Sequence, residues 1–253
     1  MLKKNKTTST DKDKKVQVSP PASSFRVVVR EVVKDKKALT AFIVIVLVLL
    51  LTFGGSLFLN SDKVTEANII EAYTGWFTDG HLLGTDDGGR DVLNLLIMGG
   101  RNSILIGLGV TAVCETVGLV VGLVSGYYGG YIDAVIMRIV DFVQVLPATP
   151  IEIVLVTVVP HYSPVTLVWI ISIFGWTGTA RYFRAFVLSQ RGRDYVLASK
   201  TSGSSDLKIM FREVLPNIGS MLIIDVVLTI AGNIGIETSL SLLATGYRLQ
   251  FLP

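Results

Sequence analysis

The sequence predicts an all-α fold, a polytopic bundle of transmembrane helices, and three observations lead to this class. Charged residues make up 17% of the 253 residues, whereas a soluble domain usually carries about a quarter. Half of the residues are apolar, and the mean hydropathy is +0.58. Five apolar stretches are long enough, as helices, to cross a bilayer core of about 30 Å, and they do not alternate as barrel strands would. The composition therefore disfavours a soluble enzyme.

A basic tail and a first span open the chain. Residues 1–37 hold 11 Lys and Arg against 4 Asp and Glu, and they are predicted to form a disordered cytoplasmic tail with a lead-in helix. An uncharged stretch, 38–59, follows directly as the first transmembrane helix. A basic tail can bind nucleic acid, but one that runs into a span is explained by membrane orientation, so no nucleic-acid partner is expected.

An extracytoplasmic loop at 60–102 and a core domain at 103–253 are predicted to follow. Four further spans are expected at 103–128, 134–159, 165–186 and 218–245. A cytoplasmic loop at 188–215 separates the last two.

The Lys and Arg content of the connections predicts the orientation, because basic residues are enriched on the cytoplasmic side. The loop at 60–102 has 3 basic residues beside 7 acids, whereas the stretch 181–214 has 7 beside 3 acids. The N-terminus and the 188–215 loop are therefore predicted to be cytoplasmic. The chain is expected to be a multi-pass protein of the plasma or inner membrane.

Small and charged residues inside the spans predict packing. Gly118, Gly122 and Gly126 recur at steps of four, so another helix can approach that face closely. Arg138 and Asp141 are three apart, which favours a local ion pair near the inner interface. The single cysteine, Cys114, is expected to serve packing.

Acidic residues inside the spans are candidates for a pathway. Glu152, Asp225 and Glu237 would be expensive to bury in lipid, and such charges mark either a pathway or a pairing. Both interpretations remain open for these three residues, and for Glu115 in the second span.

The motifs of several enzyme classes are absent. The chain has no G-x-x-x-x-G-K-[ST] loop, so any ATP is expected to be bound by another protein. It also lacks H-E-x-x-H, C-x-x-C and G-x-S-x-G, and His81 and His161 are far apart. No catalytic residue, metal or cofactor is predicted.

The segment between the fourth and fifth spans has a distinctive pattern. Asp194 can cap a short helix, Gly203 can end that helix in a tight bend, and Asp206 can start a second helix. Leu215 and Pro216 would then redirect the chain into the fifth span. A short helix, a glycine turn and a second amphipathic helix are therefore predicted across the inner face of the membrane.

This segment resembles the EAA loop of inner-membrane permease subunits of ATP-binding-cassette (ABC) importers, E-A-A-x-x-x-G followed thirteen residues later by proline. Gly203 and Pro216 have that spacing, while Leu197 stands at the glutamate position and Ser199 at the second alanine. Other motifs are similar to those of the "C" subunit of the dipeptide/oligopeptide and nickel permease group. They are H-x-L-G-T-D-x-x-G-R-D-V at 81–92, G-Y-Y-G-G at 126–130 with Asp133, M-R-I-V-D at 137–141 with Pro147, G-W at 175–176 with Ala180 and Arg181, and E-T-S-L-S at 237–241.

The resemblance implies the type I ABC importer permease fold and a set of partners. It implies a heterodimer with a second permease subunit, two ATP-binding subunits, an extracytoplasmic substrate-binding protein, membrane lipid and a peptide substrate. That family has six spans, so the chain, with five, is expected to be truncated at its C-terminus.

The resemblance also implies roles for two groups of residues. The coupling loop to the ATP-binding subunits would comprise Tyr195, Val196, Leu197, Ala198, Ser199, Gly203, Leu215 and Pro216. Arg191, Arg193 and Lys208 are candidate electrostatic partners of those subunits. An outer loop motif of Gly84, Thr85, Asp86, Arg90 and Asp91 would lie beneath the binding protein or frame the outer gate, or would form a structural turn.

The predicted function is a permease subunit of an ATP-driven peptide importer, which forms half of the translocation pathway and has no enzymatic activity of its own. One alternative is an ion-coupled secondary transporter that uses Glu152, Asp225 and Glu237 as a relay. Another is a truncated, non-transporting permease remnant. Uptake driven by a proton gradient without ATPase partners would identify the secondary transporter.

Overall fold

The computed structural model describes residues 33–60, 64, 66–78, 80–159 and 163–251, with the backbone alone described at 244–251. The predicted disordered leader and His161 lie outside the described residues. The chain divides into two compact units, Met1–Leu51 and Thr52–Pro253.

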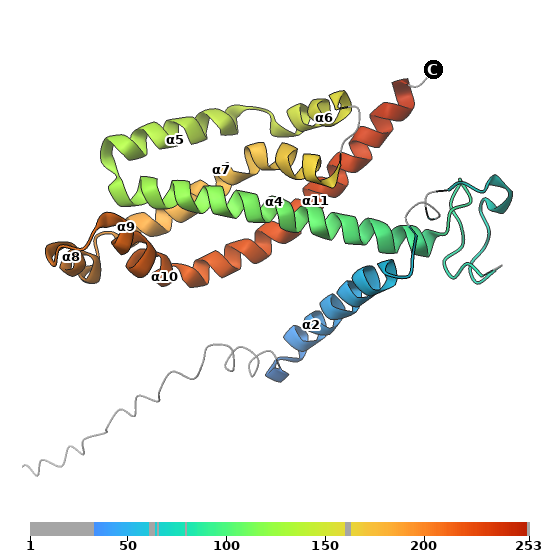
Figure 1. Cartoon of the computed structure of the whole chain (residues 1–253), viewed down its shortest axis with the longest axis horizontal. Coiled ribbons are helices and arrows are strands. Elements are labelled where there is room, and N and C mark those ends of the chain that lie inside the picture. Colours follow the sequence, from blue (N-terminus) through green and yellow to red (C-terminus); the bar gives the residue numbers. More distant parts are fainter. Residues whose placement is uncertain (1–32, 61–63, 65, 79, 160–162, 252–253) are drawn as a thin grey trace, which may run out of the picture. The chain divides into compact units, whose positions relative to one another are not determined.

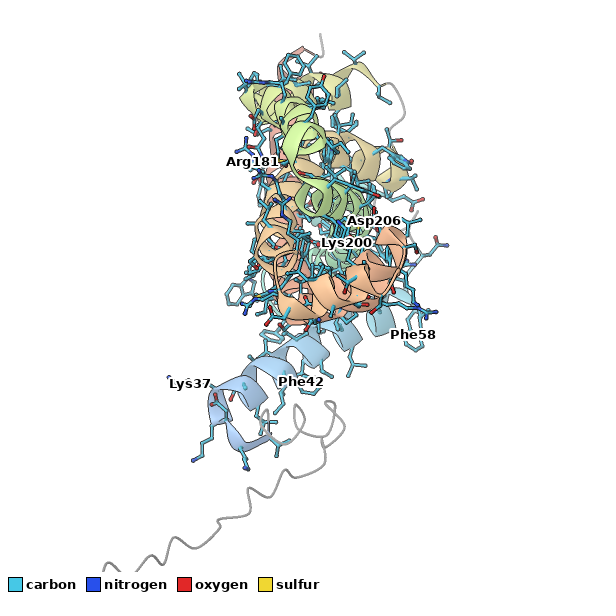
Figure 2. The ribbon with its side chains drawn as sticks, turned by 90° about the vertical axis from the view of Figure 1, so that its left-hand side faces the viewer. Lys37, Phe42, Phe58, Arg181, Lys200 and Asp206 are labelled. Atoms are coloured by element: carbon cyan, nitrogen blue, oxygen red, sulfur yellow. The ribbon has the colours of Figure 1, made fainter. Side chains whose placement is uncertain are left out.

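The first helix of the described chain is α2 (Lys36–Leu49), which continues without a break into the π-helical turn η1 (Leu50–Gly54). Asp35 caps it, since its carboxylate accepts the backbone N–H of Lys37 at 2.9 Å. Apolar side chains of α2, such as Phe42 at 56% exposed (Figure 2), are open around the helix. A helix that is apolar all round suits a lipid environment, as predicted for 38–59.

The second unit is helical throughout its longer elements, which confirms the all-α prediction. In chain order, its elements are η2 (Ile69–Glu71), α4 (Val92–Tyr128), α5 (Gly130–Val145), α6 (Ala148–Val158), α7 (Pro164–Gln190), α8 (Asp194–Thr201), α9 (Asp206–Ile209), η3 (Met210–Val214), α10 (Leu215–Asn217) and α11 (Gly219–Phe251). Two isolated β-bridges, at Thr78–His81 and Thr85–Asp91, are the only β-pairings of the described residues.

Three single helices of the described chain are long and apolar enough to span a membrane: Lys36–Gly54, Val92–Tyr128 and Gly219–Leu243. α5 and α6 together qualify as a fourth span, bent by 70°. The prediction counted five, and the difference is α7. This helix has sufficient length, with 27 residues, but it includes polar residues such as Ser172, Thr177 and Thr179 that are buried in the protein and need no lipid-compatible side chain.

Two predicted spans differ from the observed helices. α4 begins at Val92 rather than near residue 103, because Asp91 accepts the backbone N–H of Asn94 at 3.0 Å and caps the helix. The single span predicted at 134–159 is two helices, because Pro147 biases the preceding Leu146 toward extended backbone (ψ 137°) and ends α5.

The glycine face of α4 packs against α7, as predicted, and the two helices run side by side (Figure 1). A Cβ atom at Gly118 would lie 2.6 Å from Thr179 Cβ, one at Gly122 would lie 2.8 Å from the Ala180 carbonyl oxygen, and one at Gly126 would lie 2.8 Å from Val187 Cβ. Any side chain at these positions would push the helices apart.

α5 reverses direction at Gly129 and is tied to α7 by two ion pairs. Asp133 receives Nε and Nη2 of Arg184, both at 2.5 Å, and Asp141 receives Nη2 of Arg181 at 2.5 Å. The local Arg138–Asp141 pair expected from the sequence is wrong. Asp141 instead pairs across the helix contact with a residue 40 positions away.

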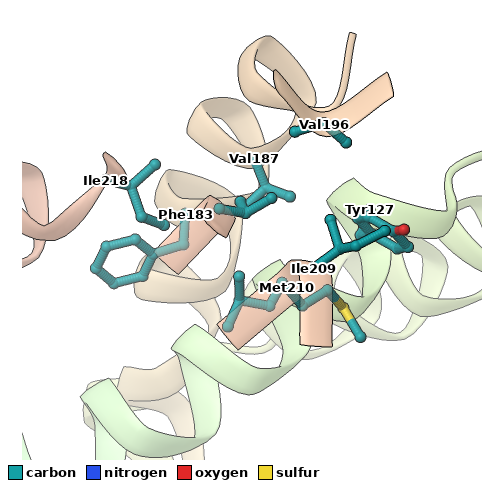
Figure 3. Packing of buried hydrophobic residues seen from close by; sticks show 9 residues of the cluster. Tyr127, Phe183, Val187, Val196, Ile209, Met210 and Ile218 are labelled. Carbon is teal, nitrogen blue, oxygen red and sulfur yellow. The ribbon is translucent and has the colours of Figure 1, made fainter. Parts of the chain in front are cut away.

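Two hydrophobic clusters form the core of the second unit. The first joins α4, α6, α7 and α11, and it includes Cys114, which is 1% exposed and serves packing as predicted. The second joins the C-terminal end of α4 to α7, α8, α9 and η3 (Figure 3). Its members are Leu123, Tyr127, Phe183, Val187, Val196, Ile209, Met210, Val214 and Ile218.

Candidate coupling segment, outer loop and buried acids

The segment 191–218 forms a helical hairpin after α7, as the sequence predicted. α8 starts with Arg193 as its N-cap residue, which makes no side-chain cap, so the capping role expected for Asp194 is wrong. Asp194 is instead the first helical residue, where its charge favours the helix dipole. Asp206 is the first residue of α9, as the sequence predicted, and Ser205 is the N-cap residue.

Gly203 ends α8 in the predicted tight bend. Its φ is +79°, and its N–H donates to the Lys200 carbonyl at 3.1 Å, while the Ser204 N–H donates to the Ser199 carbonyl at 3.1 Å. This pair of bonds is a Schellman motif, which favours glycine because of the positive φ. No atom lies within 4 Å of a Cβ at Gly203, so the requirement is the backbone conformation rather than space.

One side of α8 holds it against the neighbouring helices. Val196 is 2% exposed within the second cluster, and the Tyr195 hydroxyl donates to Gln190 Oε1 at 3.1 Å. The Ser199 hydroxyl donates to the Glu213 carboxylate of η3. Burial raises the pKa of Tyr195, and the nearby Glu213 charge adds to this effect, although Arg193 opposes it. α8 is therefore fixed to α7 and to η3.

The opposite side of α8 is open. Leu197 is 50% exposed, and Ala198 is also exposed, as are Arg191, Arg193 and Lys208 around it. Leu215 and Pro216 lie in α10, directly before α11 begins at Gly219, which is the redirection that the sequence predicted. The eight predicted coupling residues thus form three groups. The first anchors the hairpin, the second shapes its turns, and the third lies on the open side: Tyr195, Val196 and Ser199; Gly203, Leu215 and Pro216; Leu197 and Ala198.

The outer loop motif folds onto the preceding residues 68–74. The Asp86 carboxylate accepts the backbone N–H groups of Gly88 and Arg90 at 2.9 Å each, and it pairs with Arg90 Nη2 at 2.7 Å. The Thr85 hydroxyl donates to the Glu71 carbonyl and accepts the Thr74 N–H at 2.8 Å. The motif therefore builds a hydrogen-bonded turn.

Two glycines of this loop are required by close backbone contacts. A Cβ at Gly84 (φ +73°) would lie 2.4 Å from the Thr74 carbonyl oxygen, and one at Gly89 (φ +71°) would lie 1.8 Å from that of Asn68. Both features favour the structural-turn interpretation of the motif.

A charged pair joins the two ends of the loop. His81 Nδ1 lies 2.7 Å from Asp91 Oδ2, and His81 Nε2 lies 3.6 Å from Glu71 Oε2. The hydrogen bond to Asp91, together with both carboxylate charges, raises the pKa of His81. Burial would raise the pKa of Asp91, but the hydrogen bonds from His81 and Asn94 outweigh it and lower that pKa. The pair therefore stabilises the loop most at a pH between the lowered pKa of Asp91 and the raised pKa of His81.

The three candidate pathway acids lie at helix contacts inside the second unit. Glu152 of α6 is 5% exposed, and Glu237 of α11 is 6% exposed, with Ser241 donating to its carboxylate at 3.0 Å. Asp225 of α11 is half-buried, and its Oδ2 has no hydrogen-bond partner among the described residues. Glu115 of α4, a fourth acid inside a span, lies near Asp225. Both carboxylate oxygens of Glu115 are buried without a hydrogen-bond partner among the described residues.

Several residues of these sites could not be found from the sequence. Tyr127 donates its hydroxyl to Asp206 Oδ1 at 2.8 Å and so joins α4 to α9, and Glu213 is the partner of Ser199. Both contacts join positions in different helices, and no local pattern marks them. Among the described residues, no group of His, Cys, Asp and Glu could hold a metal ion.

Comparison with known proteins identifies the family of the chain. Residues 118–252 match the family model described as "Binding-protein-dependent transport system inner membrane component". The chain is 46% identical over 216 residues to the oligopeptide transport system permease protein OppC of Lactococcus lactis subsp. lactis (strain IL1403), which covers 85% of the chain and 74% of that relative.

Two relatives from Bacillus subtilis (strain 168) extend the comparison. Its oligopeptide transport system permease protein OppC is 33% identical over 212 residues, covering 84% of the chain and 68% of the relative. Its dipeptide transport system permease protein DppC is 31% identical over 227 residues, covering 88% of the chain and 68% of the relative. The chain therefore belongs to the family of inner membrane components of binding-protein-dependent transport systems.

Proposed function

We propose that the chain is a permease subunit of an ATP-driven importer of oligopeptides or dipeptides. The similarity to OppC and DppC proteins over more than four fifths of the chain supports this substrate class. The absence of a Walker loop from the sequence fits a subunit that relies on separate ATP-binding proteins. The partners are a second permease, two ATP-binding subunits and an extracytoplasmic binding protein, and the N-terminus is cytoplasmic.

The observation that carries the proposal is the attachment of α8. A helix that transmits motion must be rigidly connected to the spans and must present a free side to its partner. Tyr195, Val196 and Ser199 provide the connection. Leu197 and Ala198 lie on the open side, and they are the residues that we propose contact an ATP-binding subunit.

The buried acids and the outer loop have secondary roles in this proposal. Glu152 of α6 and Glu237 of α11 are buried in helices that pack against each other, and Asp225 of α11 lies near Glu115 of α4. We propose that these three acids respond to helix rearrangement next to the pathway. The turn built by Gly84, Thr85, Asp86, Arg90 and Asp91 would give the binding protein a rigid surface. Neither role is needed for the α8 contact.

Affinity purification tests the α8 contact. The tagged chain is extracted from native membranes in mild detergent, and the co-purified ATP-binding subunits are quantified. Gly203→Pro removes the N–H that bonds to Lys200 and forbids the positive φ, so recovery should be lost. Gly192→Ala is the matched control, because no atom lies within 4 Å of a Cβ there.

A second pair of variants tests the open side of α8. Ala198→Arg places a long charged side chain on that side and should also abolish recovery, without disturbing the anchoring contacts. Leu197→Glu introduces the glutamate of the EAA motif and should preserve the recovery of ATP-binding subunits. Equal recovery with Gly203→Pro, Ala198→Arg and Gly192→Ala would overturn the coupling assignment.

A further inference from the structure

A pocket of about 300 Å³ opens between the C-terminal end of α4 and α8. Its size is at the lower end of the range for small-ligand sites, about 300–1,000 Å³. Its lining residues are Tyr127, Tyr128, Arg191, Gly192, Val196, Leu197 and Lys200.

The pocket is cationic. Arg191 and Lys200 contribute two positive charges, and no carboxylate is among the lining residues. Neither cation forms an ion pair with a carboxylate in the part of the chain that the structure describes. Two acidic groups near the pocket are already engaged, since Asp206 accepts the Tyr127 hydroxyl and Asp133 is held by Arg184. The two charges are therefore available to an external anion.

Both cations are positioned by the surrounding residues. Lys200 Nζ lies 6.0 Å from the centroid of the Tyr127 ring, whose hydroxyl is bonded at 2.8 Å to Asp206 in the neighbouring α9 (Figure 2 labels Lys200 and Asp206). The Arg191 guanidinium lies against the bare backbone of Gly129, where a Cβ would be 2.0 Å from Nη1. Gly129 has φ +65°, a conformation that favours glycine, and its lack of a side chain leaves room for the guanidinium.

The pocket lies at the end of a membrane span. Tyr127 and Tyr128 are the last two residues of α4, a helix of 37 residues that qualifies as a span. Tyrosine is enriched where spans meet the lipid head groups. Exposed apolar surface from Tyr128 adjoins the two cations. This combination matches a phosphate group attached to an apolar tail better than it matches a free anion.

We propose that this pocket binds the phosphate head group of an anionic phospholipid, with Arg191 and Lys200 contacting the phosphate and Tyr128 contacting the glycerol and upper acyl chain. The site is independent of the solute that is transported, and only the choice of leaflet depends on the proposed orientation. Because Lys200 belongs to α8, the lipid would join that helix to the membrane surface.

The test counts lipids on the full-length chain in nanodiscs of phosphatidylcholine, with or without phosphatidylglycerol, by native mass spectrometry. The double variant Arg191→Gln/Lys200→Gln should bind phosphatidylglycerol at least about tenfold more weakly than wild type, because each basic residue near a membrane surface contributes to anionic lipid binding. The control, Arg193→Gln/Lys208→Gln, removes the same charge from exposed positions outside the pocket and should bind normally.

Equal retention of phosphatidylglycerol by the two double variants would overturn the proposal. Inorganic phosphate provides a second arm, and binding of phosphate as tight as that of the lipid would assign the pocket to a free anion instead. A third contrary result is that Arg191→Gln/Lys200→Gln binds phosphatidylglycerol as wild type does but no longer co-purifies with an ATP-binding subunit. That result would assign the pocket to an acidic group of the partner protein. Thermal unfolding in phosphatidylcholine alone checks that each variant is folded. If the double variant unfolds at a lower temperature than wild type, the lipid count is repeated with the single variant Lys200→Gln, which changes an exposed side chain.

Discussion

The contact between α4 and α7 gives the sharpest prediction for the stability of the bundle. In Gly122→Ala, the new Cβ would lie 2.8 Å from the Ala180 carbonyl oxygen and 2.9 Å from both Arg184 N and Phe183 Cβ. Ordinary contacts are about 3.5–4.0 Å, so the helices must separate locally by roughly 0.6–1.2 Å. Two of the three neighbours are backbone atoms, and they cannot move without moving α7.

Overpacking of this kind costs about 1–3 kcal/mol. Replacing a helical glycine by alanine also returns about 0.5–1 kcal/mol through backbone entropy. The expected net destabilisation of Gly122→Ala is therefore about 0–2.5 kcal/mol. Gly178→Ala on α7 is the matched control, because no atom lies within 4 Å of a Cβ there and only the favourable term applies.

The assay is equilibrium unfolding in mixed detergent micelles, followed by far-ultraviolet circular dichroism. The difference between the two variants isolates the overpacking cost, which we expect to be about 1–3 kcal/mol. If Gly122→Ala and Gly178→Ala unfold at the same detergent fraction, the close α4–α7 packing is incorrect.

Three further predictions concern other contacts. Ser199→Ala removes the hydrogen bond that joins α8 to η3, so α8 should lose about 1 kcal/mol of protection in hydrogen exchange, whereas unchanged exchange would refute the anchor. Arg184→Gln removes the cation that pairs with Asp133 of α5, whose side chain is 13% exposed. The variant should be destabilised, but by less than the about 3–5 kcal/mol that breaking a fully buried ion pair costs. Arg181→Gln, in a pair whose members are each 48% exposed, should cost only about 0–1 kcal/mol, and equal melting of the two variants would contradict this ranking. In the outer loop, protection should fall as pH rises through the raised pKa of His81 and again as pH drops through the lowered pKa of Asp91, and His81→Asn should abolish only the upper fall.

The helix contacts that depend on local spacing could be predicted from the sequence. Steps of four among Gly118, Gly122 and Gly126 identify a close-packed face, and α7 packs on it. The Gly203 turn was equally predictable, because glycine is favoured at the positive φ that ends a helix. In both cases a few neighbouring helical turns contain the whole signal.

Contacts between distant segments could not be predicted in this way. Arg138 and Asp141 have the spacing of an ion pair, but the antiparallel packing of α5 on α7 gives Asp141 a partner 40 residues away. Pro147 signalled a possible break in the sequence, but the residues on both sides of it are apolar, and this favoured a single span over the bent pair of helices that forms. The cationic pocket likewise depends on the meeting of α4 and α8 and has no sequence signature.

Uptake by the reconstituted transporter distinguishes an ATP-driven importer from a secondary transporter. The chain, co-purified with its partners and placed in liposomes with the binding protein, should accumulate a labelled oligopeptide only when ATP is present on the side of α8. Uptake should survive a proton uncoupler and stop with a non-hydrolysable ATP analogue. Accumulation that needs a proton gradient and no ATP would contradict the account and favour a secondary transporter.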